Sequence, residues 1–397
     1  MVREVAIIGI GMHPWGKFPD KDVVDMCVES TLASMQESKI NWREVEAIAS
    51  GCWAWAGTGG PGLTIGNRML ERLGETGVPV VNVYNACATP IATLGTAYNF
   101  IATGQADIVL AVGADKSPGG FFTSTYEYPR DPYYLRMRMV GATNTTYWAL
   151  WARRRMQEVG TTAWHYAKVK EKNSHNGVLN PMARYRRVYS VDEVLNSPMV
   201  SDPLTLYEVC ATSDGAAAVM LCSMDKAIKY TSKPVKLSAA VVATSRFGDP
   251  TMVIPYLSRQ TKQTLPVHSE VRNAAQRAYK IAGVNPADVD VIELHDACTY
   301  HELAYLEALL DLHEGEADRM LERGELDING KLPVSPSGGS SSFGEAVAAQ
   351  GLFQVCELVW QLRGEAGKRQ VKDAKIGLSQ TYGAWGNCSV CIVEKAF

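Results

Sequence analysis

The feature that most constrains the fold is a regular alternation of short apolar runs with longer amphipathic segments. An apolar run at residues 5–10 is followed by an amphipathic segment at 23–37 and by a second apolar run at 45–50. Short apolar runs predict buried strands, and apolar residues three or four positions apart predict helices. This order predicts an α/β protein in which helices cover mostly parallel strands.

The same pattern starts again in the second half of the chain. A strand is expected at residues 235–243, a helix at 271–282 and a strand at 289–294. The segments REVEAIASG and ADVDVIELH each follow an amphipathic segment in their half. Such self-similarity predicts the duplication of one α/β unit, with a first half at 1–230 and a second at 231–397.

Residues from about 117 to 205 break the alternation with clusters of Pro, Tyr and Arg. Long irregular segments within a compact protein are often functional. We therefore expect an inserted loop or cap domain within the first half.

Composition excludes several classes of function. The 39 Lys and Arg residues nearly balance the 42 Asp and Glu residues, giving a formal net charge of -3. A nucleic acid or an anionic membrane is therefore not an expected partner. No apolar run approaches the roughly 18 residues of a membrane helix. The N-terminus has no small-residue cleavage site of a signal peptide, which favours a cytoplasmic location.

The cysteine content points the same way. Nine is an odd number of cysteines in a chain of 397 residues, which argues against a complete disulfide framework. We expect a reducing compartment and no metal held by this chain. One or more of the thiols is then a candidate for chemistry.

Cys87 is the first candidate, in the segment VVNVYNACATPIATLG. This segment predicts a strand, a sharp turn and a helix, with Cys87 at the helix N-terminus. Unpaired N–H groups there stabilise a thiolate and make the cysteine nucleophilic. The alternative, that Cys87 is only a small buried apolar residue, stays open at this stage.

Four segments together resemble the active-site loops of the thiolase superfamily, and they occur in the family's order. They are NACATP around Cys87, ELHDACTYHE at 293–302, SPSGGSSSFGEAVAAQG at 335–351 and SQTYGAWGN at 379–387. The His-Asp pair in ELHDACTYHE, at positions 295 and 296, is similar to the pair that sterol-carrier-protein-type and archaeal thiolases carry in the corresponding loop. The resemblance implies a five-layered α-β-α-β-α fold made of two half-domains, and a homodimer.

The resemblance also implies roles for three residues. Cys87 would be the nucleophile, and His295 would help to form an oxyanion hole. Glu345 stands where the family has the histidine of Gly-His-Pro, which accepts the proton of the nucleophile. Burial would raise the pKa of Glu345 toward neutrality and suit it to acid or base chemistry. The alternatives are that His295 is a histidine at a strand end whose hydrogen bonds are all made within the protein, and that Glu345 is a solvated glutamate at a helix start.

The second acid of the family is a cysteine in a Cys-Gly-Gly-Gly loop, and this chain lacks it. Tyr382 occupies its approximate place. Sterol-carrier-type members take the acid from a cysteine in the His-Asp loop, where Ala297 stands here and Cys298 follows. Cys298 is thus the first candidate for the acid that protonates the departing carbanion, Tyr382 the second and Tyr300 the third.

The resemblance implies an acyl-CoA substrate, with coenzyme A as co-substrate. The residues expected to bind substrate are Trp53, Trp55, Tyr126, Tyr300, Gly339, Ser340 and Gly383. Aromatic walls suit a bulky or aromatic acyl group, such as benzoylsuccinyl-CoA, cleaved to benzoyl-CoA and succinyl-CoA. Basic runs at 153–155 and 184–187 could bind CoA phosphates, or could be ordinary solvated faces.

Chains of this type resemble thiolases that act with a small partner carrying a zinc ribbon and an OB-fold. Any zinc would belong to that partner. Two other functions stay open. One is a retro-aldolase that cleaves a steroid side-chain CoA thioester with tyrosines, of which Tyr300 resembles one. The other is a lipid-transfer subunit without catalytic activity, in which Cys87 would be inert.

Overall fold

The computed structural model describes residues 2–53, 61–117, 143–244, 267–383 and 386–397. The strands in this part of the chain are β1 (Val5–Gly16), β2 (Ala47–Gly51), β3 (Val80–Val83), β4 (Ile108–Lys116), β5 (Met199–Ser201), β6 (Leu204–Thr205), β7 (Asp214–Ser223), β8 (Val235–Ala243), β9 (Val291–Glu293), β10 (Ile376–Gly383) and β11 (Asn387–Lys395). The α-helices are α1 (Val23–Ser38), α2 (Ile65–Leu73), α3 (Thr89–Ala102), α5 (Asn144–Glu158), α6 (Ala163–Gly177), α7 (Val191–Leu195), α8 (Met224–Ala227), α9 (Ser269–Ala282), α10 (Thr299–Leu310), α11 (Glu316–Glu322), α12 (Gly339–Phe343) and α13 (Gln350–Arg363).

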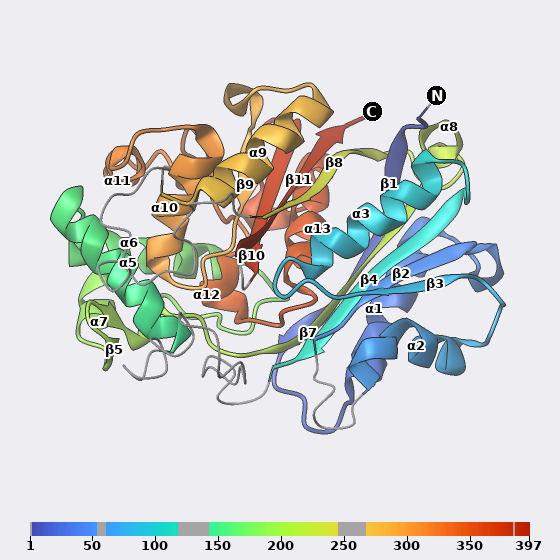
Figure 1. Cartoon of the computed structure of the whole chain (residues 1–397), viewed down its shortest axis with the longest axis horizontal. Coiled ribbons are helices and arrows are strands. Elements are labelled where there is room, and N and C mark those ends of the chain that lie inside the picture. The colour runs from blue at the N-terminus through green and yellow to red at the C-terminus, as the bar shows by residue number, and fades with distance from the viewer. Residues whose placement is uncertain (1, 54–60, 118–142, 245–266, 384–385) are drawn as a thin grey trace, which may run out of the picture.

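The large sheet has the strand order β3-β2-β4-β7-β1-β8-β11-β10-β9 (Figure 1). The pairs β2–β3, β2–β4 and β9–β10 are parallel, but the other neighbours are antiparallel. The expectation of mostly parallel strands is therefore wrong. One reason is that β10 ends at Gly383 and β11 begins at Asn387, and so short a connection joins antiparallel strands.

The sheet divides where β1 meets β8. These strands pair only through Ala6 with Lys236 and Ile7 with Val235. On one side lie the strands of the N-terminal half, β3-β2-β4-β7-β1, and on the other lie β8-β11-β10-β9. Each half of the chain thus builds its own half-sheet.

Helices α3 and α13 form the central layer, between the two half-sheets (Figure 1). Leu94 of α3 and Leu358 of α13 share one apolar cluster with Val219 of the first half-sheet and Val393 of the second. Strands buried on both faces explain the continuous apolar runs in the sequence.

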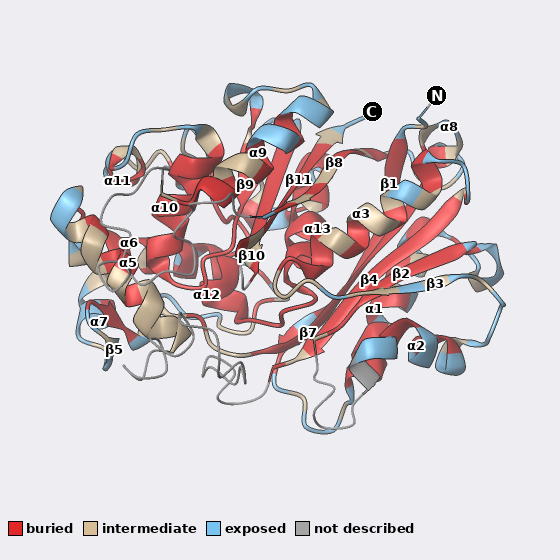
Figure 2. Cartoon of the chain, viewed as in Figure 1, coloured by how far each residue is buried: buried red, intermediate tan, exposed pale blue. Residues whose placement is uncertain are grey.

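The outer helices cover the other faces of the two half-sheets. Met26 of α1 packs in a cluster with Ile48 of β2, and Val271 of α9 packs in another with Ile392 of β11. The layers therefore follow the order α-β-α-β-α, which confirms the predicted thiolase fold. Figure 2 shows most strands and helix α13 largely buried, whereas β3 and α3 also carry intermediate and exposed positions.

The two halves repeat one local structure, as the sequence predicts. Asn41 caps a short 3-10 helix whose third residue, Glu44, bonds back to it, and β2 follows. Asn285 and Asp288 make the same capping box before β9. Each box satisfies backbone N–H groups at the point where the chain turns into a strand.

Residues 143–205 of the predicted insertion contain α5, α6 and α7 (Figure 1). Helix α6 packs against α10, α11 and α12, α5 packs against α10, and α7 packs against α6. Arg155 of α5 anchors this region, with Nη1 2.7 Å from Glu307 Oε2 and Nη2 2.7 Å from Asp318 Oδ1. The side chain of Arg155 is buried. Arg155 therefore matches neither interpretation of the basic run at 153–155, phosphate binding or a solvated face, because it is buried and these carboxylates already neutralise it.

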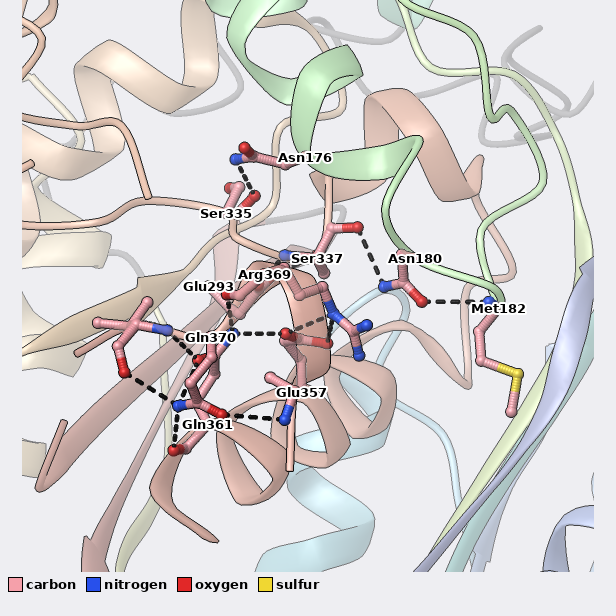
Figure 3. A network of polar contacts seen from close by, with 12 residues as sticks. Asn176, Asn180, Met182, Glu293, Ser335, Ser337, Glu357, Gln361, Arg369 and Gln370 are labelled. Atoms are coloured by element: carbon pink, nitrogen blue, oxygen red, sulfur yellow. Dashed lines mark hydrogen bonds and ion pairs between the residues drawn. The ribbon is translucent and has the colours of Figure 1, made fainter. Parts of the chain in front are cut away.

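A network of polar contacts ties the insertion to the C-terminal half (Figure 3). Asn176 and Asn180 donate to the carbonyl oxygens of Ser335 and Ser337, at 3.0 and 3.1 Å. Ser337 in turn donates through its N–H and its hydroxyl to the carboxyl group of Glu293 on β9. The loop that leads to Gly339 and Glu345 is thus held from two sides.

Among the described residues, no helix combines the length and apolar character needed to span a bilayer.

Candidate active site

Cys87 lies in a tight turn between β3 and α3. Ala86 adopts a φ of 47°, and Thr89 accepts the N–H of Asn85 while donating to the Ala86 carbonyl. The helix begins at Thr89, with Pro90 in its first turn. The predicted strand, turn and helix are confirmed, and Cys87 is half-buried just before the helix N-terminus.

Glu345 faces Cys87 from the loop between α12 and α13. The Cys87 thiol donates to Glu345 Oε1 across 3.1 Å. The carboxyl group is 1% exposed, so the alternative of a solvated glutamate at a helix start is wrong. A carboxylate at this distance from a thiol has the geometry of a general base.

His295 completes the cluster from the loop after β9. Its Nε2 lies 3.4 Å from Glu345 Oε1, and it has no hydrogen-bond partner among the described residues. Its Nδ1 lies 3.1 Å from the carbonyl oxygen and 3.2 Å from the N–H of Tyr382. The ring is thereby oriented with Nε2 toward the Cys87 and Glu345 side chains, where a substrate oxygen could receive a hydrogen bond.

The electrostatics of Glu345 differ from the expectation. Burial on its own would raise the pKa of this carboxyl group, but attraction to His295 and hydrogen bonds from two thiols outweigh burial, and the pKa is lowered. The prediction of a pKa raised toward neutrality is therefore wrong. Glu345 is ionised at neutral pH, as a proton acceptor must be.

Asp296 fixes the glycine-rich loop beside the site. Its carboxylate accepts the N–H groups of Ser340, at 2.5 Å, and Ser341, at 3.2 Å. Gly339 adopts a φ of 62°, and a Cβ there would approach the Asp296 carboxylate to 2.6 Å. Asp296 thus orients the loop. Gly339 and Ser340 are buried, and substrate binding by these two residues stays a prediction.

Two glycines permit close approach of the loops. A Cβ at Gly383 would lie 2.9 Å from the N–H nitrogen of Ala88 and 3.0 Å from that of Cys87. Gly344 has a φ of 77°, and a Cβ there would lie 2.8 Å from the carbonyl oxygen of Ala211. Only glycine lets β10 touch the Cys87 turn and lets the chain enter Glu345 in this direction.

The three candidates for a second acid occupy different surroundings. Cys298 is buried, its thiol lies 3.5 Å from His301 Nδ1, and burial raises its pKa. Tyr382 presents its backbone to His295, while its ring stacks on that of Tyr305. The role of any of these residues as an acid stays a prediction.

Tyr300 is 1% exposed, and burial raises the pKa of its hydroxyl group. That hydroxyl lies 2.8 Å from His268 Nε2. Tyr300 also lines a cavity of about 580 Å³ together with Arg154 and Arg272. A role in substrate binding stays a prediction.

The expected aromatic wall is only partly within the described structure. Trp53 is half-buried and follows β2. Trp55 and Tyr126 lie outside the described residues.

None of the nine cysteines, all of which lie in the described part of the chain, forms a disulfide. The sequence has one Cys-x-x-Cys spacing of the kind that can bind a metal, from Cys388 to Cys391 on β11. Cys388 belongs to the outer cluster of the second half-sheet and Cys391 to the central cluster, so the two thiols point to opposite faces. Within the described ranges, no group of three His, Cys, Asp or Glu side chains is placed to hold a metal.

Sequence reasoning missed one residue of the cluster. Cys210 donates its thiol hydrogen to Glu345 Oε2 across 3.4 Å. It precedes β7 and lies far from every active-site segment in the sequence. The backbone brings it there, because Val209 pairs with Cys298 and Thr212 pairs with Glu345.

Comparisons with known families agree with this geometry. The profile described as "Thiolase, N-terminal domain" matches residues 5–176, and the profile "Thiolase C-terminal domain-like" matches residues 256–395.

Three curated relatives are similar along the whole chain. The chain is 33% identical to an acetyl-CoA acetyltransferase of Methanothermobacter thermautotrophicus, with 97% of each chain covered. It is 34% identical to human sterol carrier protein 2, covering 100% of this chain and 73% of the relative. It is 30% identical to the benzoylsuccinyl-CoA thiolase subunit BbsB of Thauera aromatica, covering 97% of this chain and 96% of the relative.

Two solved structures share the fold. An Ltp2-ChsH2(DUF35) aldolase has a TM-score of 0.82 at 24% identity, with 98% of each chain covered. Human mitochondrial 3-ketoacyl-CoA thiolase in complex with CoA has a TM-score of 0.72 at 16% identity, covering 100% of this chain and 98% of the other. With whole-length relatives above 30% identity and a cysteine, a histidine and a glutamate converging on one site, the chain belongs to the thiolase family of acyl-CoA acyltransferases.

Proposed function

We propose that this chain cleaves, or forms in reverse, a carbon–carbon bond in a β-ketoacyl-CoA through an acyl-enzyme on Cys87. The observation that carries the proposal is the 3.1 Å hydrogen bond from the Cys87 thiol to Glu345 Oε1, with His295 Nε2 3.4 Å from the same oxygen. This arrangement joins a nucleophile, a base and a hydrogen-bond donor.

In the first half-reaction the Cys87 proton passes to Glu345, and the sulfur attacks the β-keto carbon. His295 Nε2 stabilises the negative charge on the oxygen of the intermediate. The carbon–carbon bond then breaks, leaving the acyl group on sulfur. The departing carbanion takes a proton from a second acid, for which Cys298 is the first candidate, followed by Tyr382 and Tyr300.

In the second half-reaction coenzyme A is the co-substrate. Its thiol gives its proton to the second acid, which the first half-reaction left deprotonated, and attacks the acyl-enzyme carbonyl. The Cys87 sulfur leaves and takes back the proton held on Glu345. Covalent capture divides one difficult step into two easier ones. Claisen condensation follows the same path in reverse.

The proposed acyl group is bulky or aromatic, with benzoylsuccinyl-CoA as the substrate that gives benzoyl-CoA and succinyl-CoA. Supporting it are the similarity to a benzoylsuccinyl-CoA thiolase subunit and the aromatic residues predicted around the site, including Trp53. This function lies in the degradation of aromatic compounds such as toluene.

The proposal includes a homodimer that binds a small zinc-ribbon and OB-fold subunit. A relative named as a subunit and a structural neighbour named with a DUF35 component support it. It also includes a cytoplasmic location, which nine cysteines without a disulfide would suit.

The test is a cleavage assay on the full chain, alone and with any small subunit that co-purifies. Benzoylsuccinyl-CoA and acetoacetyl-CoA are compared with and without free coenzyme A. We expect release of benzoyl-CoA and succinyl-CoA that requires both coenzyme A and Cys87. An enzyme that cleaves acetoacetyl-CoA but not benzoylsuccinyl-CoA would overturn the aromatic specificity. Undiminished release of both products by Cys87→Ala would overturn the acyl-enzyme.

A retro-aldolase acting on a steroid side-chain CoA thioester is the second candidate. The observation that favours it is the buried Tyr300 hydroxyl 2.8 Å from His268 Nε2, since an imidazole can take up the proton of such a hydroxyl. Aldol cleavage consumes no coenzyme A and needs no thiol. Cleavage of a β-hydroxyacyl steroid thioester that is unchanged in Cys87→Ala and abolished in Tyr300→Phe would establish it.

A further inference from the structure

The Glu345 carboxylate bridges two thiols, and only one of them belongs to the nucleophile. Cys87 donates to Oε1 across 3.1 Å and Cys210 donates to Oε2 across 3.4 Å. Each oxygen of the base therefore has its own sulfur partner, and His295 approaches the oxygen that faces Cys87.

The two thiols differ in access. Cys210 is 4% exposed, whereas Cys87 is half-buried and is the only one of the nine cysteines that is not buried. Burial and the charge of Glu345 raise the pKa of Cys210 well above its ordinary value. Cys210 therefore keeps its proton and remains a hydrogen-bond donor while Cys87 reacts.

The segment that carries Cys210 is fixed between the two other active-site loops. On one side the Cys210 N–H donates to the Ala297 carbonyl, at 3.0 Å, in the His295 loop. On the other side the Glu345 N–H donates to the Ala211 carbonyl at 2.7 Å, and the Ser213 N–H donates to the Glu345 carbonyl at 2.9 Å. These backbone bonds give the thiol a fixed position relative to the carboxylate.

We propose that Cys210 is a positioning residue of this site, whose thiol holds the Glu345 carboxylate with Oε1 toward the Cys87 proton. A glutamate has more rotatable bonds than the histidine it replaces in the family's usual loop, so its carboxylate needs a second anchor. Cys210 supplies that anchor from the buried side, at Oε2. The inference deepens the proposed acyl transfer and assigns Cys210 no contact with substrate.

The test is alkylation of Cys87 by iodoacetamide, followed by mass spectrometry of the Cys87 peptide between pH 4 and pH 9. This reaction needs no substrate, and the other cysteines are buried. Three variants are compared with the wild type: Cys210→Ala, which removes the donor, Cys210→Ser, which keeps one, and Cys222→Ala. Cys222 is an equally buried thiol on β7 that donates to the Ser223 carbonyl, so it serves as the matched control.

We expect Cys210→Ala to slow alkylation at neutral pH about tenfold, because the carboxylate loses its second anchor and no longer holds Oε1 toward the Cys87 proton. The acid limb, the fall of the alkylation rate as pH decreases, should move to higher pH in this variant, because the carboxylate loses a donor and binds a proton more readily. Cys210→Ser should restore both the rate and the limb, and Cys222→Ala should match the wild type.

Equal rates and equal acid limbs in Cys210→Ala and Cys222→Ala would overturn the inference. So would a Cys210→Ser variant as slow as Cys210→Ala, since the thiol would then only fill space. Should Cys210→Ala fail to fold, Cys210→Val fills the space without donating and takes its place. A chain that alkylates as expected but cleaves none of the tested thioesters would keep this inference and overturn the proposed function.

Discussion

Glu345 and Glu293 are both fully buried, yet their neighbours prepare them for opposite states. Glu345 is surrounded by His295 and two thiols, and its pKa is lowered. Glu293 meets Ser337 and the charge of Glu357, and burial together with that charge raises its pKa well above the ordinary value. Burial alone therefore does not decide whether a carboxyl group is a base, because the partners determine the sign.

The difference extends to what each group holds. Glu293 accepts two hydrogen bonds from Ser337 and keeps a loop in place. Glu345 also has backbone bonds to Ala211 and Ser213, but its carboxylate faces a half-buried thiol. One carboxyl group supports structure, and the other is positioned to take a proton.

The largest expected effect comes from Glu345→Gln. The amide is nearly the same size but cannot accept the Cys87 proton, so acylation of Cys87 should slow by about 100- to 1,000-fold. Rapid mixing with an acyl-CoA and quenching for mass spectrometry measures the rate. Glu293→Gln is the matched control and should stay within about twofold of the wild type. Equal slowing in both variants would contradict the distinction between Glu345 as a base and Glu293 as a structural group.

The pH dependence sharpens the same comparison. Glu345 accepts a proton only when ionised, and its pKa lies below the ordinary value of 4.5. The midpoint of the fall in acylation rate on acidification should therefore lie below pH 4.5. A limb near neutral pH that disappears in Glu345→Gln would show that burial, and not the partners, dominates.

A smaller effect is expected from Gly383→Ala, which tests the geometry around Cys87. The added Cβ would meet backbone atoms of Ala88 and Cys87 at 2.9 and 3.0 Å. The turn must shift, and acylation should slow about tenfold or more, as misplaced reacting groups do.

Gly377→Ala on the same strand is the matched control for this substitution. Its Cβ would meet only the side chain of Leu358, at 3.0 to 3.3 Å, and that side chain can move. Acylation should stay near the wild-type rate. Equal rates in both variants would mean that close contact of β10 with the Cys87 turn does not matter.

The smallest effect is on stability alone and concerns Glu293→Gln. Because the folded-state pKa of Glu293 is raised, the native protein binds its proton more tightly than the unfolded chain. Wild-type stability should therefore fall as pH rises from the ordinary glutamate range toward the raised value, whereas the variant lacks this loss. Thermal unfolding at pH 4.5 and pH 8 should show the variant gaining relative stability, by about 1 to 3 kcal/mol. A constant difference would contradict the raised pKa.

Local patterns in the sequence predicted an α/β fold and the turn at Cys87, whereas the five layers were implied by the resemblance to thiolases. The strand at Val235–Ala243 was expected at those bounds, and the Cys87 turn is visible in one short segment. His295 and Glu345 were implied by the resemblance of their loops to those of thiolases, and no local physical pattern singles them out.

The residue that the sequence did not predict, and the predictions that were wrong, depend on contacts between segments far apart in the chain. Cys210 reaches Glu345 through backbone pairing of residues 209–213 with two loops, and no local pattern reveals that pairing. The pKa of Glu345 was predicted from burial alone, without its partners. Arg155 belongs to a basic run in the sequence, but Glu307 and Asp318 come from helices far along the chain.

The central claim is that Cys87 becomes acylated with Glu345 as its proton acceptor. Its most direct test is the mass of the intact protein after brief exposure to an acyl-CoA, with the modified peptide then sequenced. The account predicts one acyl group on Cys87 in the wild type, none in Cys87→Ala and slow appearance in Glu345→Gln. A wild-type enzyme that turns over substrate while Cys87 stays unmodified, or that carries the acyl group on another residue, would contradict it.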